Sequence, residues 1–302
     1  MELSRAMQIM RDLTAALVTA LFMFPVFWWA LTSIKPISAV FNKDRVVWFD
    51  FTPTLINYAV TLFGRSRSQM AIDEGLGMGV AGAEAYDSRQ TIVDSIIISV
   101  GATTITILVA VFAAYALSRM RFKGRESYLN WVLGQRFMPP IAILVPLVTI
   151  YSGLGMRDIQ NIYLGYIGLM LIYALMNLPI ALLLMKSFFD DIPKDVDEAA
   201  MIDGATRWQS FAKVVLPMVR GGVAASAVLC FVFSWTEFLL SLFLTTDIRT
   251  VPVKIQTFVT STGNEWGFIA ALGTAAMIPS FIFILLVQRH LVRGLTLGSL
   301  KE

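Results

Sequence analysis

Long apolar runs separated by short polar segments set the pattern of this chain. Six runs are long enough to cross the hydrocarbon core of a bilayer, which is about 30 Å thick and needs about 20 residues of α-helix. Such runs form helices because a helix satisfies its own backbone groups in lipid. The pattern predicts an all-α membrane protein, a single domain over residues 1–302, with six transmembrane helices near 13–34, 95–117, 131–151, 162–185, 223–244 and 267–288.

The third run is the least regular of the six. It contains Pro139 and Pro140 side by side, and proline removes a backbone N–H and clashes with the preceding turn. Membrane helices tolerate proline where neighbouring groups satisfy the freed carbonyls. We therefore expect a kink or a break in this span.

The first run follows Arg5 and Arg11, as a secretory signal would. It is longer than the apolar core of a signal, and the segment WWALTSIK lacks a small-residue cleavage pattern. We expect an uncleaved membrane anchor.

Basic residues gather in the loops on one side of the expected bundle. The strongest group lies in segment 118–130, with Arg119, Arg121, Lys123 and Arg125. Cytoplasmic loops are enriched in Lys and Arg, so this bias predicts cytoplasmic N- and C-termini and an external loop at 35–94. The composition, 57% hydrophobic and 15% charged, is typical of a membrane protein, and the net charge of +3 needs no nucleic acid partner to explain it.

The chain is poor in residues that catalyse reactions or bind metals. His290 is its single histidine and Cys230 its single cysteine, so a metal site or a nucleophile paired with histidine would lack partners. No glycine is followed by lysine, which excludes a P-loop, and the glycine-rich segment 75–82 is expected to be a flexible external loop. We expect no catalytic residue and no metal here, and any ATP with its Mg²⁺ to be bound by another chain.

A charged, helix-prone segment, DVDEAAMIDGATRWQSFAKVVLP (195–217), stands out from these apolar runs. Asp195, with Glu198 three residues later, resembles a capping box and favours a helix that starts there. Gly204 can end that helix in a left-handed conformation at little cost. Thr206, with glutamine three residues later, repeats the start signal, so a second helix is expected up to the closing Leu-Pro.

The first of these two helices has residues suited to docking. Small or adaptable side chains let another backbone come close, and they are Ala199, Ala200 and Met201. Acids surround them: Asp195, Asp197, Glu198 and Asp203. On these residues alone the segment fits either a docking helix or a solvated amphipathic linker.

The spacing in this segment resembles the EAA signature of permease subunits in bacterial ABC importers. That signature reads Glu-Ala-Ala, three residues, Gly, nine residues, an aliphatic residue, one more, then Leu-Pro. Here Glu198-Ala199-Ala200, Gly204, Val214 and Leu216-Pro217 take those places. Other segments resemble the carbohydrate-importer branch, which includes the smaller maltose-permease subunit: FTPTLINY (51–58), RFMPPIAILVPL (136–147), FFDDIPKDVDEAA (188–200), SWTEFLLSLFLT (234–245) and GLTLGSLKE (294–302).

Three features depart from that branch. Thr236 stands where relatives often have Asn before the glutamate of the fifth span, and Gly221-Gly222 replaces a proline often found after the Leu-Pro. The external loop, 59–93, is longer than usual, which leaves the form of the external face open.

The resemblance implies an ABC importer type I permease fold in a bacterial cytoplasmic (inner) membrane. It implies a second homologous permease, two copies of a cytoplasmic ATP-binding subunit and an external solute-binding protein as partners. The loop 186–222 would carry the helix that couples to the ATPase, through Glu198, Ala199, Ala200, Asp203, Gly204 and Pro217. The tail, 289–302, would reach between the ATPase subunits, through Gly294, Thr296, Gly298 and Lys301.

Polar or aromatic residues inside the spans are candidates for the translocation path. A carboxylate as deep as Glu237 usually faces the bundle interior or a water-filled cavity, although buried polar packing is the alternative. Trp235 would stack on a sugar ring or fill the bundle, and Asn177 would line the path or satisfy freed carbonyls. Gln135 is a further candidate, whereas Arg136 is expected to snorkel toward the inner headgroups.

We therefore expect the membrane subunit of an ATP-driven carbohydrate importer and no enzyme activity in this chain. The same architecture could carry a polyol, a glycerol phosphodiester or an acidic sugar derivative. A membrane enzyme would need catalytic polar residues at one depth, and a proton-coupled secondary transporter would use Glu237 as its carrier.

Overall fold

The computed structural model describes residues 4–42, 46–66, 87–157, 161–260 and 263–298, with side chains up to residue 288. The described elements are helices and one two-stranded antiparallel pairing of β1 (Val259–Thr260) with β2 (Gly263–Asn264). They form two compact units, residues 1–90 with 254–277 and residues 91–253 with 278–302. The expected all-α membrane fold is confirmed.

The first unit begins with the long helix α1 (Arg5–Ser33), followed by α2 (Ile37–Val40) and α3 (Ile56–Phe63). Ser4 starts α1 by accepting a hydrogen bond from the backbone of Met7. Asn57 of α3 fastens the other end, because its amide donates to the carbonyls of Ser33 and Lys35 at 2.9 Å each.

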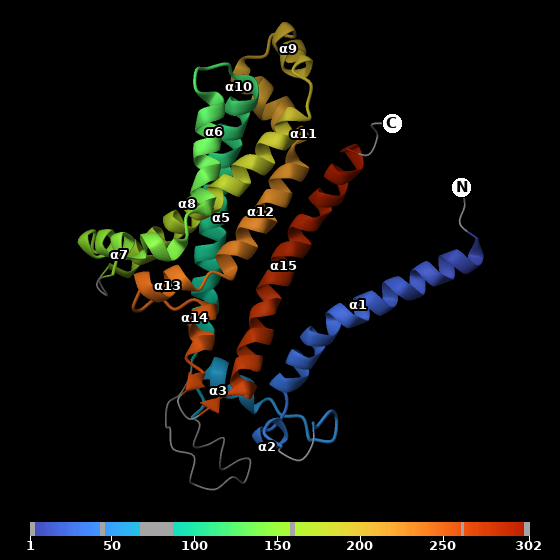
Figure 1. Ribbon diagram of the computed structural model, residues 1–302, viewed down its shortest axis with the longest axis vertical. Coiled ribbons are helices and arrows are strands. Elements are labelled where there is room, and N and C mark those ends of the chain that lie inside the picture. Colours follow the sequence, from blue (N-terminus) through green and yellow to red (C-terminus); the bar gives the residue numbers. More distant parts are fainter. Residues whose placement is uncertain (1–3, 43–45, 67–86, 158–160, 261–262, 299–302) are drawn as a thin grey trace. The chain divides into compact units, whose positions relative to one another are not determined.

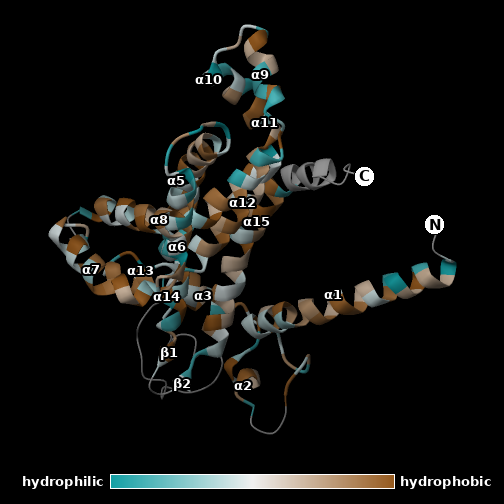
Figure 2. Cartoon of the chain, turned by 45° about the horizontal axis from the view of Figure 1, so that its top comes forward, coloured by the Kyte–Doolittle hydropathy of each residue, from teal (hydrophilic) through white to brown (hydrophobic). Residues whose placement is uncertain are grey.

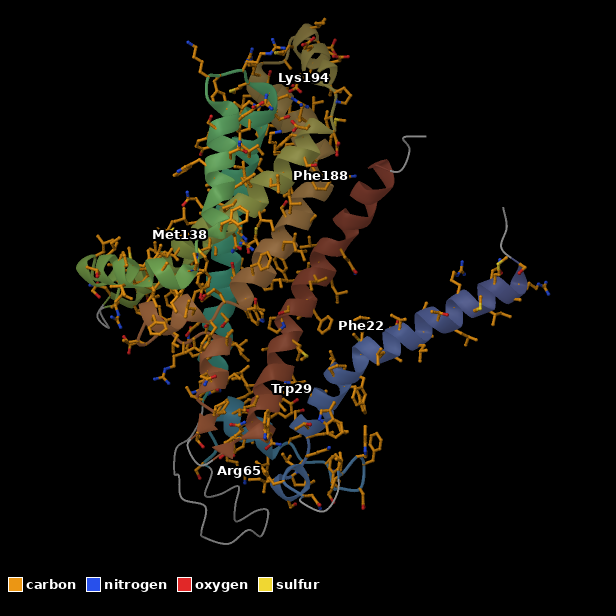
Figure 3. The ribbon with its side chains drawn as sticks, viewed as in Figure 1. Phe22, Trp29, Arg65, Met138, Phe188 and Lys194 are labelled. Carbon is orange, nitrogen blue, oxygen red and sulfur yellow. The ribbon has the colours of Figure 1, made fainter. Side chains whose placement is uncertain are left out.

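The apolar run of α1 is exposed in the part of the chain that the structure describes. None of its most apolar 18-residue window is buried, and side chains such as Leu17 and Phe22 (labelled in Figure 3) are about 70% exposed. An apolar surface of this length needs lipid or another protein around it.

The second unit contains α8 (Ile162–Asp190), α12 (Arg220–Trp235) and the polar element (Figure 1). Helix α5 (Arg89–Arg119) is followed by a bent, segmented arm and then by helix α8. The polar turn and helix α12 come next. The arm consists of α6 (Arg125–Gly134), η1 (Gln135–Phe137), η2 (Pro140–Ile143) and α7 (Leu144–Gly153). The polar turn consists of α9 (Asp195–Ile202), α10 (Arg207–Ser210), the π-helical turn η4 (Phe211–Val215) and α11 (Leu216–Met218).

Four uninterrupted helices of the described chain are long and apolar enough to span a membrane: α1, α5, α8 and the part Trp266–Gln288 of α15 (Trp266–Gly298). Two bent pairs would raise the number to six. One pair, Arg125–Phe137 with Pro140–Gly153, bends by 94° beside Met138 (Figure 3), which confirms the break expected at Pro139 and Pro140. The other pair, Arg207–Met218 with Arg220–Trp235, bends by 71°.

The fifth predicted span, 223–244, is wrong as a single helix. Helix α12 ends at Trp235, and a short helix, α13 (Leu239–Leu244), starts after a break at residues 236–238. The break is possible because Glu237 supplies hydrogen bonds to the start of α13, and backbone groups inside a membrane must be satisfied internally.

Helices α8 and α12 pack together at close range. A Cβ built on Gly222 would lie 2.3 Å from the ring of Phe188 on α8 (Figure 3), a distance that side chains do not tolerate. Gly222 at the start of α12 therefore leaves room for an aromatic ring. A buried apolar cluster that includes Leu182, Met185 and Cys230 continues the packing.

We predict that Gly222→Ala destabilises the protein by about 1–3 kcal/mol, because the added methyl group overpacks the contact with Phe188. Gly134→Ala is the matched control, since a Cβ at Gly134 meets nothing within 4 Å. Thermal unfolding of the detergent-solubilised variants checks this, and equal effects at the two glycines would contradict the close packing of α8 with α12.

Candidate functional site

Helix α9 starts where the sequence predicts, but for a different reason. The expected capping box between Asp195 and Glu198 does not form, since Lys194 is the N-cap and makes no side-chain capping bond. The backbone turn begins earlier, because Val196 N donates to the carbonyl of Pro193 at 3.2 Å. The acids of the first turn still favour the helix through its dipole.

The turn after α9 follows the prediction. Gly204 has φ +89° and ends the helix in the left-handed region. Thr206 then caps α10 with both bonds of a capping box, its hydroxyl accepting from Gln209 N at 3.2 Å and its N–H donating to Gln209 Oε1 at 2.8 Å. The second helix continues through η4 and α11, which contains Pro217.

One face of α9 is open to a partner. Figure 2 shows the polar residues of α9 and α10 beyond the apolar helices of the same unit. Glu198, Ala199 and Asp203 are exposed, whereas Ala200 is half-buried. Ile202 is 85% exposed, and the sequence analysis missed it because it looked for small and acidic residues. Single exposed apolar residues are common on protein surfaces, so the docking surface remains a prediction to which Ile202 adds one more candidate residue.

The opposite face of α9 turns inward. Asp197, expected among the outward acids, is 8% exposed and accepts hydrogen bonds from Tyr115 and Arg119 of α5. Arg119 was expected as a loop charge only. In a helix of 3.6 residues per turn, Ala199 and Ile202 lie about opposite Asp197, so the inward carboxylate sets which residues face outward.

Aromatic rings hold α10 and η4 against α5. Phe112 of α5 lies 6.1 Å from Trp208 and 5.7 Å from Phe211, and Tyr115 lies 4.7 Å from Phe211, between ring centroids. The polar turn is therefore seated on a helix to which it is not adjacent in the chain.

The tail residues of the prediction are only partly described. Gly294, Thr296 and Gly298 fall in the last turns of α15, whose side chains are outside the described part, and Lys301 lies outside the described residues altogether. Residues 67–86, the larger part of the segment 59–93 that was expected to form a long external loop, lie outside it too.

A cavity opens at the break in the bent arm. Its volume of about 600 Å³ lies within the usual range of ligand sites, about 300–1,000 Å³. Three of the predicted path residues line the cavity: Gln135, Asn177 and Glu237. Two further polar residues, Arg136 and Ser234, line it as well. Its rings are Tyr128, Trp131, Tyr173 and Phe233. Sequence analysis missed Ser234 and Tyr173, because an ordinary serine or tyrosine in an apolar run carries no signal of what it faces.

Glu237 lines this cavity and also holds the backbone around it. One carboxylate oxygen accepts from Leu240 N at 2.9 Å, and the other accepts from Ser241 N at 3.2 Å and from the Tyr173 hydroxyl at 2.7 Å. Glu237 therefore caps α13 and ties it to α8. The hydrogen bonds give Glu237 the polar packing role, and its place in the translocation path stays a prediction that its position at the cavity supports.

Arg136 contacts the two neighbouring helices, and its expected snorkelling toward the headgroups stays a prediction. Its Nη1 donates to the carbonyl of Met176 on α8 at 3.3 Å, and its guanidinium lies 5.0 Å from the ring centroid of Phe233 on α12. The broken arm turns this residue toward the neighbouring helices, which a continuous third helix would not do. Asn177 of α8 donates to Ser234 of α12 at 3.0 Å, as a structural role requires.

Trp235 is not among the residues that line the cavity. It is 8% exposed and stacks on Phe231 at 5.5 Å, which in turn stacks on Phe283 of α15 at 4.0 Å. The structure therefore gives Trp235 the packing role of the two considered.

Comparison with known proteins supplies the family. Residues 106–297 match the family described as "Binding-protein-dependent transport system inner membrane component". The sulfoquinovosyl glycerol transport system permease protein SmoH of Agrobacterium fabrum is 33% identical over 97% of this chain and 93% of that protein. The trehalose transport system permease protein SugB of Mycobacterium tuberculosis is 33% identical over 94% of each chain.

Two further similarities agree with these. The trehalose/maltose transport system permease protein MalG of Thermococcus litoralis is 38% identical over 69% of this chain and 74% of that protein. The crystal structure of a bacterial ABC transporter involved in the import of alginate contains a chain with a TM-score of 0.66. That match covers 96% of this chain and 99% of the other at 19% identity, and is a likeness of fold.

We predict that Glu237→Ala lowers the stability of the protein by about 1–3 kcal/mol, because the hydrogen bonds that cap α13 are lost. Glu237→Gln should cost less, since its amide oxygen still accepts. Thr236→Val is the control, because the exposed Thr236 hydroxyl, which directly follows α12, donates to Val232 O of that helix and not to α13. Thermal unfolding of the three variants in detergent decides this, and a Glu237→Ala variant as stable as the control would remove the capping role.

We predict that a cysteine at Gln135 reacts with a membrane-impermeant thiol reagent, whereas a cysteine at Trp235 does not. Gln135 is exposed to the cavity and Trp235 is packed against Phe231. The native Cys230 is fully buried and provides a silent background. Equal reaction at the two positions, measured by mass shift, would contradict the exposure of Gln135 at the cavity and the packing of Trp235 against Phe231.

Proposed function

Because this chain belongs to the family of binding-protein-dependent transport system inner membrane components, we propose that it is the membrane-spanning subunit of an ATP-driven carbohydrate importer. The observation that carries the proposal is the polar turn, α9 to α11. It is fastened to the apolar helices by one face and leaves Glu198, Ala199 and Ile202 exposed on the other.

The polar turn is the docking element for a partner ATPase. Ala199 and the half-buried Ala200 let the partner's backbone approach, Glu198 and Asp203 meet its basic or donor groups, and Ile202 fills an apolar pocket. Gly204 holds the turn after the helix, and Pro217 ends the element near α12. ATP and Mg²⁺ are bound by the partner, present in two copies.

The remaining partners follow from the same architecture. A second, homologous permease covers the exposed apolar surface, and an external solute-binding protein delivers the solute. ATP binding draws the docking helices together and favours one arrangement of the spans, and hydrolysis restores the other, so the cavity opens to each side in turn.

The N- and C-termini lie on the cytoplasmic side, as the basic loops predict. The tail residues Gly294, Thr296, Gly298 and Lys301 stay candidates for contact with the ATPase.

The solute is a carbohydrate or a sugar derivative. The names of three relatives give sulfoquinovosyl glycerol, trehalose and maltose as their solutes. The cavity offers rings such as Trp131 and Phe233 beside hydrogen-bonding groups of Gln135 and Asn177, and such a mixture suits the apolar faces and hydroxyl groups of sugars. A proton-coupled mechanism through Glu237 is disfavoured, because its carboxylate is committed to three hydrogen bonds that hold α13 and Tyr173.

The test is affinity purification of the tagged chain from its native membrane in mild detergent, with partners identified by mass spectrometry. A second permease and an ATPase should be recovered with the native chain. Recovery of the chain alone, together with solute uptake that needs no ATP, would contradict the proposed function.

We predict that Gly204→Val reduces the recovered ATPase by about fivefold or more, because a β-branched residue is strained at positive φ. Gly204→Asn is the matched variant, since Asn tolerates this conformation and a Cβ at Gly204 meets nothing within 4 Å in this chain. ATPase retained with Asn and lost with Val assigns the effect to the turn. Retention with both would remove Gly204 from the docking geometry.

A further inference from the structure

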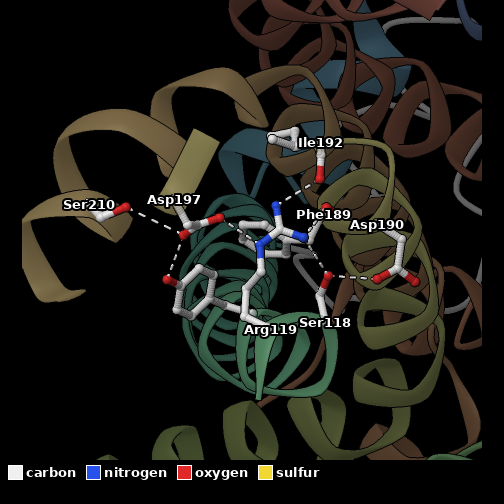
Figure 4. Close-up of polar contacts among 8 residues, drawn as sticks. Ser118, Arg119, Phe189, Asp190, Ile192, Asp197 and Ser210 are labelled. Atoms are coloured by element: carbon white, nitrogen blue, oxygen red, sulfur yellow. Dashed lines mark hydrogen bonds and ion pairs between the residues drawn. The ribbon is translucent and has the colours of Figure 1, made fainter. Parts of the chain in front are cut away.

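The guanidinium of Arg119 occupies a buried position where helix α5 ends. Its Nε donates to Asp197 of α9 at 2.7 Å, and the two side chains are 8% and 11% exposed. Its Nη1 donates to the carbonyl of Phe189 at 3.0 Å, and its Nη2 donates to the carbonyl of Ile192 at 2.9 Å (Figure 4). One side chain therefore connects α9, the end of α8 and α5.

The carboxylate of Asp197 is satisfied from several sides. Besides Arg119, it accepts from the Tyr115 hydroxyl of α5 at 2.9 Å and from the Ser210 hydroxyl of α10 at 3.4 Å. Ser118 continues the network toward α8 by donating to Asp190 at 2.6 Å. We call Arg119, Asp197 and Tyr115 the α5 clasp.

The clasp joins segments that the backbone does not join. Helix α9 follows α8 after residues 191–194 and leads through α10, η4 and α11 into α12. Helix α5, in contrast, is far from α9 in the sequence, since 78 residues separate Arg119 from Asp197, and its hydrogen bonds to Asp197 are made by side chains. Apolar ring contacts can slide over one another, whereas a buried charge pair with a forked guanidinium has a fixed geometry.

Helix α5 leads from the clasp to the cavity. Ile98 and Ala102 of α5 belong to one buried cluster with Tyr173 and Leu240. Tyr173 and Leu240 are two of the groups that bond to the Glu237 carboxylate at the break before α13. A displacement of α5 along its length therefore reaches the residues that shape the cavity.

We propose that Arg119 is a positioning residue that makes α5 move as one body with the docking helix α9 during the ATPase cycle. This inference rests on the proposed function, since the load on α9 comes from the partner ATPase. Without the clasp, the ATPase still docks on the outer face of α9. Its motion then reaches α8 and α12 through the backbone, but reaches α5 only through apolar and aromatic contacts, which can slide.

The test measures the distance between two spin labels, on Met120→Cys just after α5 and on Asp195→Cys at the start of α9, both exposed positions. The complex with its ATPase is measured without nucleotide and after trapping with ATP, Mg²⁺ and vanadate. With Arg119 present, the distance distribution should be narrow and the same in both states. With Arg119→Gln it should shift or widen in the trapped state only.

Three further variants make the test specific. Arg121→Gln removes the same charge at an exposed position two residues away and should behave like the native chain. Arg119→Lys keeps the charge but loses the forked bonds, so its distribution should be intermediate. Asp197→Asn, similar in size, replaces Arg119→Gln if that variant cannot be recovered from membranes, and should give the same state-dependent widening.

The outcomes separate the inference from the proposed function. An ATPase recovered with every variant, and an Arg119→Gln distribution that matches the native one in both states, would overturn the inference alone. Equal widening in both states would also overturn it, because that outcome means a structural role without a role in transmission. A native chain that recovers no ATPase would overturn the inference and the proposed docking together.

Discussion

Arg119 and Asp197 bury opposite charges where the polar turn meets the apolar helices. Neither charge could be buried alone at a tolerable cost, and the pair is stable because nearby hydroxyls and carbonyls satisfy the remaining donors and acceptors. Since Asp197 must face inward, helical geometry turns Ala199 and Ile202 outward. One face of the charged turn is therefore fixed to α5 by the buried pair, and the opposite face, with Ala199 and Ile202, is exposed.

The need to satisfy every buried polar group also shapes the interior of the second unit. Backbone breaks near Pro139 and at residues 236–238 interrupt segments that would otherwise be continuous helices. Such breaks survive in a membrane only when side chains satisfy the freed groups, and Glu237 does so for α13. The breaks create a cavity, and the polar groups that stabilise them line it.

Sequence patterns predict the features that depend on a single segment. Apolar runs of sufficient length predict the spans, adjacent prolines predict the break in the third, and Gly204 with Thr206 predicts the turn after α9. Features that depend on a partner elsewhere in the fold could not be predicted this way. The inward turn of Asp197 needs Arg119, the packing of Trp235 needs Phe231, and the capping role of Glu237 needs a helix break that hydropathy does not reveal. Ile202 looks like any other apolar residue until its exposure is known.

The most direct test of this account is the structure of the complex purified from its native membrane, determined by cryo-electron microscopy. The account predicts an ATPase subunit with α9 seated in a cleft, Ile202 and Ala199 buried against it, and the Arg119–Asp197 pair intact behind them. A complex in which α9 faces solvent while the ATPase binds elsewhere on the chain would contradict it.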